Sequence, residues 1–377
     1  MLQKFLQEKP LYYSEIDYSR MPRVYKSIKE HLKLPKIIHI IGTNGKGTTG
    51  RFLASALYSL GFSTGHYSSP HIINFNERIW LNSKDVNDIE LDRAHSSLLN
   101  LLSKEDADSL SYFEYTTLLA MVIFQDLEYV VLEAGLGGEY DATSVFENIL
   151  TLVTPIDIDH EAFLGTTIKE IATTKLNAIQ KQAIIANQTH QEVYEVASLN
   201  SLHVEMVDDI LNEEDLRKIE QISERLLLAS YLKENLKLAI CALKSLDLEY
   251  KVDTFNNSKL FGRLTKYRDN IILDVGHNVL AAHSILQALK EEKYILVYNS
   301  YRDKNYKEIL TILKPITLHV ELIDIEDLRV EDEEIMQNTL NLLDIKYKKF
   351  TKVKVDQNYL VFGSFSVVEE FLKVYDE

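Results

Sequence analysis

Cysteine is almost missing from this sequence, which has one such residue, Cys241, among 377. A single thiol excludes an internal disulfide and a metal cluster held by several cysteines. Because unpaired cysteine is typical of reducing compartments, we expect a cytoplasmic protein.

Long apolar runs are lacking as well, and no stretch has the length and composition of a membrane span. The first residues show neither the apolar segment nor the small-residue cleavage site of a secretion signal, so we expect no secretion and no membrane partner. Internal repeats and low-complexity segments are also missing. With 46% hydrophobic and 26% charged residues, the composition is that of an ordinary globular protein.

Positively charged residues are fewer than negatively charged ones. The sequence has 41 Lys and Arg and 57 Asp and Glu, which gives a net charge of −16. Such an acidic chain repels polyanions, which disfavours nucleic acid as a partner. An anionic substrate would therefore need a locally positive site.

The strongest signal lies in residues 37–60. An apolar, β-branched run predicts a buried strand, three glycines follow within six residues, and apolar side chains then recur at helical spacing. Such a loop exposes backbone N–H groups to an anion, and the helix dipole adds positive potential. Lys46 could bind outer phosphates, and Thr48 could offer its hydroxyl to Mg²⁺. Gly47 separates these two residues, unlike the common P-loop, and a plain glycine-rich turn is the alternative.

Strands and helices alternate along the chain, with a long helix expected from about 223 to 246. This alternation predicts an α/β fold with largely parallel sheets covered on both faces. The periodicity is lost over residues 249–270. We therefore expect an ATP-binding domain at 1–261, a linker at 262–269 and a second α/β domain at 270–377.

Further polar clusters fall at the carboxyl ends of predicted strands, where parallel sheets bind ligands. They are residues 68–71, Glu133 with its glycines at 135–138, and residues 157–160. Each cluster alone could be a turn or a helix cap. Together they would supply oxygen and imidazole ligands to nucleotide-bound Mg²⁺. Thr48 and Glu133 suit one ion, while Ser69 and His160 suit a second.

The second half has a comparable cluster at residues 273–278. Asp274 could accept hydrogen bonds from ribose hydroxyls, and His277 could contact a carboxylate. A strand-to-helix turn capped by Asn278 explains the pattern equally well. Arg263 could reach a phosphate, or it could be an ordinary surface arginine.

Ten motifs occur in a familiar order. They are GTNGKGTT (42–49), YSSPHIINFNERI (67–79), SYFEYTT (111–117), LEAGLGGEYDAT (132–143), TPIDIDHEAFLGTTIKEIATTK (154–175), Asn235 in YLKENLKLAICAL, FGRL (261–264), LDVGHN (273–278), YRDKN (301–305) and VFGSF (361–365). In this order they resemble the folylpolyglutamate synthase and dihydrofolate synthase family of the ATP-dependent Mur ligase superfamily. The match spans nearly the whole chain.

The resemblance implies a P-loop ATPase domain with a mainly parallel sheet and a smaller, Rossmann-like C-terminal α/β domain. ATP, with two Mg²⁺ ions, would phosphorylate a carboxylate of dihydropteroate or a reduced folate. The amine of L-glutamate would then attack the acyl phosphate and form an amide. The chain would be a dihydrofolate synthase, a folylpolyglutamate synthase or both, working as a monomer.

Residue roles carry over from the matching motifs. The ATP-binding positions are Gly45, Lys46, Gly47, Thr48, Asn235, Arg263 and Asp274. The metal ligands are Thr48, Ser69, Glu133 and His160. The catalytic positions are Lys46, Lys175, which family members carry as a carbamate, and His277 and Ser364, which are associated with glutamate. The pteroate or folate positions are Asp17, Tyr18, Ser19, Arg20, Tyr112, Phe113, Glu114, Tyr140, Asp141 and Ala142.

The chain departs from the family pattern at Glu139, where an arginine is usual, so a charge near the acceptor site is reversed. Two alternatives stay open. One is a Mur-type ligase that adds an amino acid to a different acid. The other is a nucleotide-dependent regulator without ligase activity, although the Asn-Lys-x-Asp motif of guanine-nucleotide switches is lacking.

Overall fold

The computed structural model describes residues 1–9, 17–199 and 203–376. The chain divides into two compact units. The first comprises Met1–Leu228 and Leu232–Lys259, and the second comprises Ala229–Tyr231 and Leu260–Glu377. The segment 262–269, expected to be a linker, thus lies within the second unit.

The first unit is built on an eight-stranded sheet, counted over the described residues, in the order β4-β3-β2-β5-β1-β6-β7-β8. The strands are β1 (Lys36–Ile41), β2 (Thr64–Tyr67), β3 (Ile79–Leu81), β4 (Lys84–Asp85), β5 (Tyr129–Glu133), β6 (Leu150–Val153), β7 (Gln182–Ile185) and β8 (His203–Met206). All pairs are parallel except those made by β3, which runs antiparallel to both β2 and β4. The predicted mainly parallel α/β sheet is confirmed.

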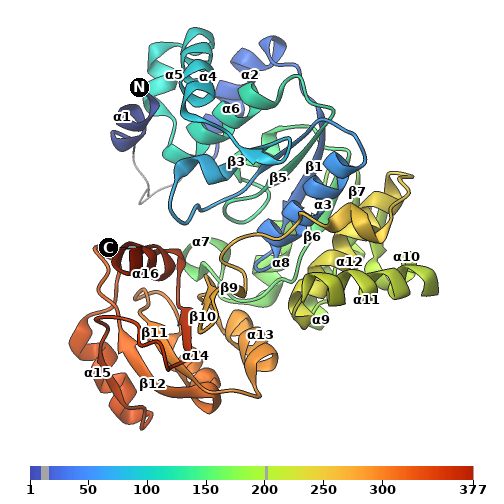
Figure 1. Ribbon diagram of the computed structural model, residues 1–377. Helices are drawn as coiled ribbons and strands as arrows, with labels where there is room; N and C mark the ends of the chain where they lie inside the picture. Colours follow the sequence, from blue (N-terminus) through green and yellow to red (C-terminus); the bar gives the residue numbers. More distant parts are fainter. Residues whose placement is uncertain (10–16, 200–202, 377) are drawn as a thin grey trace. The chain divides into compact units, whose positions relative to one another are not determined.

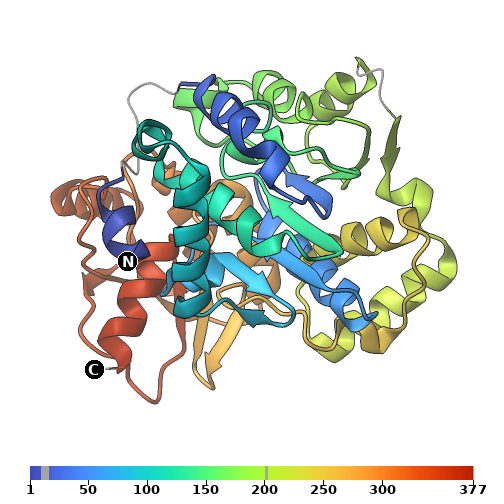
Figure 2. The ribbon, with the colours of Figure 1, turned by 90° about the horizontal axis from the view of Figure 1, so that it is seen from above.

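Helices cover both faces of this sheet (Figure 1). They are α1 (Leu2–Gln7), α2 (Arg20–Ile28), α3 (Lys46–Ser59), α4 (Asp88–Leu101), α5 (Lys104–Ser109), α6 (Tyr112–Phe124), α7 (Glu161–Leu164), α8 (Ile168–Leu176), α9 (Gln191–Leu199), α10 (Val207–Ile210), α11 (Glu213–Leu226) and α12 (Ser230–Ser245). Helices α3, α11 and α12 share one apolar core with the sheet, and α1, α2, α4 and α6 share another. Figure 2 shows α1, in dark blue, beside the teal helices α4–α6.

The prediction of one long helix from about 223 to 246 is wrong. Helix α11 ends at Leu226, Leu227 takes a left-handed conformation with φ 51°, and α12 begins at Ser230. The amide N–H of Leu227 bonds back to the carbonyl oxygens of Ser223 and Glu224, which closes the helix end. Because this break carries leucine instead of glycine or proline, the apolar pattern runs through it without a signal.

Strand register brings the loops of the first unit to one edge. The central strand β1 pairs with β5 and β6, so that Ile40 faces Glu133 and Ile41 faces Val153. Because all three strands are parallel, the loops that follow them emerge side by side. This edge carries the candidate site.

The second unit holds a six-stranded sheet within its described residues, in the order β13-β12-β11-β14-β10-β9. The strands are β9 (Thr265–Arg268), β10 (Ile271–Asp274), β11 (Tyr294–Tyr298), β12 (Thr317–Leu322), β13 (Tyr347–Lys349) and β14 (Tyr359–Phe362). The helices are α13 (Val279–Leu289), α14 (Tyr306–Leu313), α15 (Glu333–Leu342) and α16 (Phe365–Asp376). Only the edge strand β9 is antiparallel among these described strands.

Short 3₁₀ turns complete the two units. They are η1 (Lys29–His31), η2 (Phe75–Arg78), η3 (Ala142–Val145), η4 (Val252–Phe255) and η5 (Lys314–Ile316). Across the described ranges, none of the helices is both long and apolar enough to cross a bilayer.

Candidate active site

The glycine loop between β1 and α3 is closely packed. Gly45 caps α3 with φ 90°, and a Cβ atom built there would lie 2.4 Å from Oδ1 of Asn235 on α12. At Gly42, with φ 136°, a Cβ atom would lie 2.0 Å from Oγ1 of Thr154. No side chain at these positions can therefore block the approach to the first turn of α3, whose N–H groups lack intrahelical partners. The loop fits a phosphate group.

Lys46 lies at the centre of this edge. Its Nζ donates to the carbonyl oxygens of Gly42 and Thr43, each at 3.2 Å, and lies 3.9 Å from Oε1 of Glu133. Glu133 ends β5, is 5% exposed, and accepts a long hydrogen bond from the backbone N–H of Ser69 at 3.4 Å. The structure thus brings together a lysine from the start of α3, a buried carboxylate from the end of β5 and a serine from the loop after β2.

Of the residues expected to bind Mg²⁺, Ser69 contacts Glu133, whereas the side chain of His160 lies near that of Asp159. Thr48 is buried in the first turn of α3, and Ser69 adjoins Glu133. His160 precedes α7, with φ 54°, and its Nε2 lies 3.9 Å from Oδ2 of Asp159. Within the described ranges no group of three or more His, Cys, Asp or Glu could hold a metal. A set of one carboxylate with two hydroxyls still suits Mg²⁺, which keeps several water ligands.

Lys175, which looks like a surface lysine in the sequence, is 4% exposed. It lies in the last turn of α8, and its Nζ donates to the carbonyl oxygen of Gly42 at 3.0 Å. Burial, reinforced by the charge of Lys46, lowers the pKa of Lys175 to about 7. At neutral pH a large share of these amines is therefore uncharged and nucleophilic.

The glycine loop after β5, residues 134–138, packs against this lysine and is called the β5 loop below. A Cβ atom at Gly138 would lie 2.5 Å from the carbonyl oxygen of Lys175. The backbone N–H of Leu136 donates to Oδ2 of Asp141 at 2.8 Å. Asp141 is 7% exposed and also caps η3 by accepting from the backbone N–H of Thr143 at 2.9 Å.

The expected acceptor residues come together from distant segments. Nε of Arg20 lies 2.8 Å from Oε2 of Glu114, and both side chains are about nine-tenths buried. The rings of Tyr18 and Tyr140 lie 4.5 Å apart, and both residues are about half exposed. These contacts join the start of α2 to α6 and to the segment that follows the β5 loop.

Other acceptor candidates have local partners. Oδ1 of Asp17 accepts from the hydroxyl of Ser19 at 2.6 Å. The ring of Phe113 lies 5.9 Å from that of Tyr67, and Ala142 is buried at the start of η3. Only Tyr112 of the expected acceptor residues, within the described ranges, lines the cavity described next.

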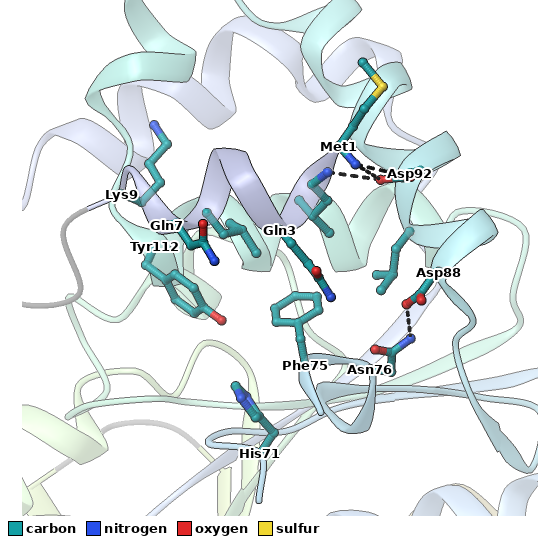
Figure 3. Close-up of a pocket in the computed structure, with 13 residues that line it drawn as sticks. Met1, Gln3, Gln7, Lys9, His71, Phe75, Asn76, Asp88, Asp92 and Tyr112 are labelled. Carbon is teal, nitrogen blue, oxygen red and sulfur yellow. Dashed lines mark hydrogen bonds and ion pairs between the residues drawn. The ribbon is translucent and has the colours of Figure 1, made fainter. Parts of the chain in front are cut away.

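A cavity of about 600 Å³ lies between α1, α4 and η2 (Figure 3). Gln3, Gln7, His71, Phe75 and Tyr112 are among the side chains around it. Nδ1 of His71 accepts from Nε of Arg78 at 2.8 Å, and burial lowers the pKa of His71 to about 4. The neutral ring therefore carries its proton on Nε2, as a donor.

In the second unit, Asp274 ends β10 and is 4% exposed. Its Oδ2 accepts from the hydroxyl of Tyr231 at 2.9 Å and from the backbone N–H of Leu264 at 2.8 Å. Its Oδ1 accepts from the backbone N–H of Gly276 at 2.8 Å. Asp274 therefore organises the turn that leads into α13.

The remaining expected residues surround the neighbouring strand end, because β10 pairs with β14. Nδ1 of His277 donates to the carbonyl oxygen of Val275 at 3.2 Å. Ser364 is 3% exposed, and its Oγ accepts from the backbone N–H of Val367 at 3.1 Å. The guanidinium of Arg263 lies 5.2 Å from the ring centre of Phe365. The second unit thus holds a polar cluster of its own.

Comparison with known proteins identifies the relatives of this chain. No model of a known protein family matches it. The dihydrofolate synthase/folylpolyglutamate synthase of Bacillus subtilis is 30% identical over 342 residues, which cover 79% of this chain and 78% of the relative. The chain belongs to the dihydrofolate synthase/folylpolyglutamate synthase family. Helicobacter pylori folylpolyglutamate synthetase has a crystal structure with a TM-score of 0.80 and 36% identity, covering 100% of this chain and 98% of that chain.

A further crystal structure, of a bifunctional folylpolyglutamate synthase/dihydrofolate synthase with Mn, AMPPNP and L-glutamate bound, has the same fold. Its TM-score is 0.79 at 23% identity, covering 96% of this chain and 94% of that chain. The family resemblance stated from the motifs is therefore confirmed. Among polar residues of this family member, sequence analysis did not single out His39 and Arg78. His39 is buried in a contact with Thr143, 104 positions along the chain, which no local pattern indicates. Arg78 is buried at the end of η2 beside His71, seven positions earlier in the same motif, so its spacing could have indicated it.

Proposed function

We propose that this protein is a dihydrofolate synthase/folylpolyglutamate synthase, an ATP-dependent ligase of acids and amino acids. The γ-phosphoryl group of ATP passes to a carboxylate oxygen of the acceptor, and ADP leaves. The amine of L-glutamate then attacks the acyl carbon, phosphate leaves, and the amine loses a proton as the amide forms. The observation that carries this proposal is the meeting of Lys46, Glu133 and Lys175 around one glycine loop.

ATP binding is assigned first to the glycine loop. The backbone of Gly45, Gly47 and Thr48 would bind phosphates, and Lys46 would offset charge on the transferring oxygens. Asn235, whose side chain lies close to Gly45, would also contact the nucleotide. Arg263 and Asp274 of the second unit are the further nucleotide contacts that we propose.

Two Mg²⁺ ions, when bound, would neutralise charge on the phosphates. We assign Thr48 and Glu133 to one ion, and Ser69 and His160 to the other. Glu133 is buried beside Lys46, so its carboxyl oxygens lie at the strand edge where a cation would bind. The relative that binds Mn, AMPPNP and L-glutamate supports the use of a divalent metal and a nucleoside triphosphate.

Lys175 is proposed to carry a carbamate. Its neutral Nζ would form a bond to the carbon of CO₂ and release a proton, so that a buried amine becomes an anion. The pKa of about 7 leaves enough neutral amine for this reaction at physiological pH. The resulting anion would lie near Lys46, whose charge it would offset.

For the other substrates, His277 and Ser364 are assigned to L-glutamate, and the segments 17–20, 112–114 and 140–142 to the acceptor. Aromatic rings in these segments suit a flat pterin. Glu139, whose carboxylate accepts from Asn177 at 2.8 Å, adds negative charge beside Tyr140. We therefore expect weaker binding of acceptors with long polyglutamate tails.

The chain is further proposed to act as a monomer in the cytoplasm. A reducing compartment would keep its one cysteine, the buried Cys241, as a free thiol.

The deciding experiment measures ADP release with ATP, Mg²⁺ and L-glutamate, using dihydropteroate or monoglutamyl tetrahydrofolate as acceptor. Stimulation by dihydropteroate alone would define a dihydrofolate synthase. Stimulation by both acceptors would define a bifunctional enzyme, and stimulation by monoglutamyl tetrahydrofolate alone would define a folylpolyglutamate synthase. If neither acceptor stimulates but another acid does, the Mur-type alternative replaces the proposal. If no pair of acid and amine stimulates, ligase activity is refuted and a regulator is favoured.

A further inference from the structure

A chain of buried hydrogen bonds links strand β1 to the β5 loop. His39, three residues before Gly42, is 1% exposed, and its Nε2 lies 2.8 Å from Oγ1 of Thr143. Oγ1 of Thr143 donates to Oδ1 of Asp141 at 2.5 Å, and Oδ2 of Asp141 accepts from the backbone N–H of Leu136 at 2.8 Å. Asp141 belongs to a segment assigned above to the acceptor, whereas His39 and Thr143 have no part in the steps proposed above.

The direction of donation follows from the protons that each group holds. Thr143 has one hydroxyl proton and gives it to Asp141, so its oxygen accepts from His39. His39 must then carry its proton on Nε2, and its Nδ1 has no hydrogen-bond partner in the described part of the chain. Burial lowers the pKa of His39 to about 4, which agrees with a neutral ring. Donation to Thr143 is the polar role of this imidazole.

A histidine is an unexpected residue at this point of β1. The other residues of the strand from Ile37 to Ile41 are all isoleucine, and all are buried. A polar group in such a place is unfavourable unless it makes a hydrogen bond. The strand itself therefore gives no reason for His39, whereas the bond to Thr143 does.

The β5 loop is what this chain of bonds restrains. Glu133 directly precedes the loop, and Asp141 accepts a hydrogen bond from the backbone N–H of Leu136 within it. Gly138, at the end of the loop, packs on the backbone of Lys175. A shift of the loop would therefore move the carboxylate beside the glycine loop and the buried amine together.

We propose that His39 is a positioning residue, which acts through Thr143 and Asp141 to hold the β5 loop in the shape required for ligation. The kinetic part of this inference rests on the proposed ligase function. The restraint on the loop does not.

Two matched pairs of variants test the chain of bonds. Thr143→Val removes the hydroxyl with little change of shape, and Thr143→Ser keeps it. His39→Leu removes the donor, whereas His39→Gln keeps an N–H donor near the place of Nε2. Hydrogen–deuterium exchange of residues 134–142 reports on the loop, and steady-state kinetics report on ligation.

Thr143→Val and His39→Leu should each speed exchange of the loop by ~10-fold and lower kcat by ~10-fold, the effect of one lost buried hydrogen bond. The KM for ATP should stay within ~2-fold, because that site is formed by a different loop. Thr143→Ser and His39→Gln should stay within ~3-fold of the parent protein in each measurement.

If these bonds served stability alone, Thr143→Val and His39→Leu would lower the folded fraction. Their kcat per folded enzyme would then equal that of Thr143→Ser and His39→Gln. Equal exchange in Thr143→Val and Thr143→Ser would overturn the restraint. Faster exchange with unchanged kcat would overturn the link to ligation. If the parent protein joins glutamate to none of the folate acceptors, the proposed function fails, while the exchange experiment still decides whether these bonds hold the loop.

Discussion

Replacing Lys175 by methionine should remove a pH dependence from the stability of the first unit. The folded-state pKa of Lys175 is about 7, below its ordinary value of 10.5. Between these values the unfolded chain holds a proton that the folded unit has released, so the free energy of unfolding rises with pH. The slope is at most about 1.4 kcal/mol per pH unit, and the rise from pH 7.5 to pH 9 is about 2 kcal/mol. Below the folded-state pKa, Lys175 is charged in both states, and the folded unit is destabilised by the full cost of burying that charge.

The assay is urea unfolding followed by the fluorescence of Trp80. This residue is the one tryptophan in the sequence and is 5% exposed on β3, so its emission reports on the first unit. The difference in unfolding free energy between the parent protein and Lys175→Met should rise by about 2 kcal/mol from pH 7.5 to pH 9, in buffers free of CO₂.

A matched control is Lys181→Met, because Lys181 is half exposed and pairs with Glu147 on the surface. The difference in unfolding free energy between Lys181→Met and the parent protein should change by less than about 0.5 kcal/mol from pH 7.5 to pH 9. If Lys175→Met behaves like this control, the amine is not held in the buried state described here, and its proposed carbamate loses its basis.

The remaining predictions concern the site and the acceptor region. Lys46→Ala should lower kcat for ligation by at least ~10²-fold, because a charge beside the transferring phosphoryl group is lost, and near-normal turnover would refute the phosphate-binding role. His160→Ala should raise the Mg²⁺ concentration needed for half-maximal ADP release, and an unchanged metal titration would remove it from the ligand set. Arg20→Met should destabilise the first unit by about 3 kcal/mol, since it leaves the carboxylate of Glu114 buried without its partner. Adding Glu114→Gln should restore part of that loss in urea unfolding, and equal stability of the single and double variants would argue against a buried pair.

The sequence by itself determined the features that short-range patterns encode. An isoleucine-rich run, closely spaced glycines and an apolar helix face are local, and they indicate the glycine loop at 42–48 without help from any distant residue. The alternation of strands and helices likewise indicates mainly parallel sheets, since each element follows from the period of its own apolar residues. The order of motifs indicates the family.

Tertiary structure decided what depends on residues that meet from far along the chain. Lys175 is buried because the last turn of α8 packs against the glycine loop. Its Nζ there donates to the carbonyl oxygen of Gly42, 133 positions away in the sequence. The pair of Arg20 with Glu114 joins residues 94 positions apart. The break at Leu227 was hidden because an uninterrupted apolar pattern also permits one longer helix. Sequence period determines which face of an element is apolar, but only packing determines which polar group is buried beside it and how its pKa responds.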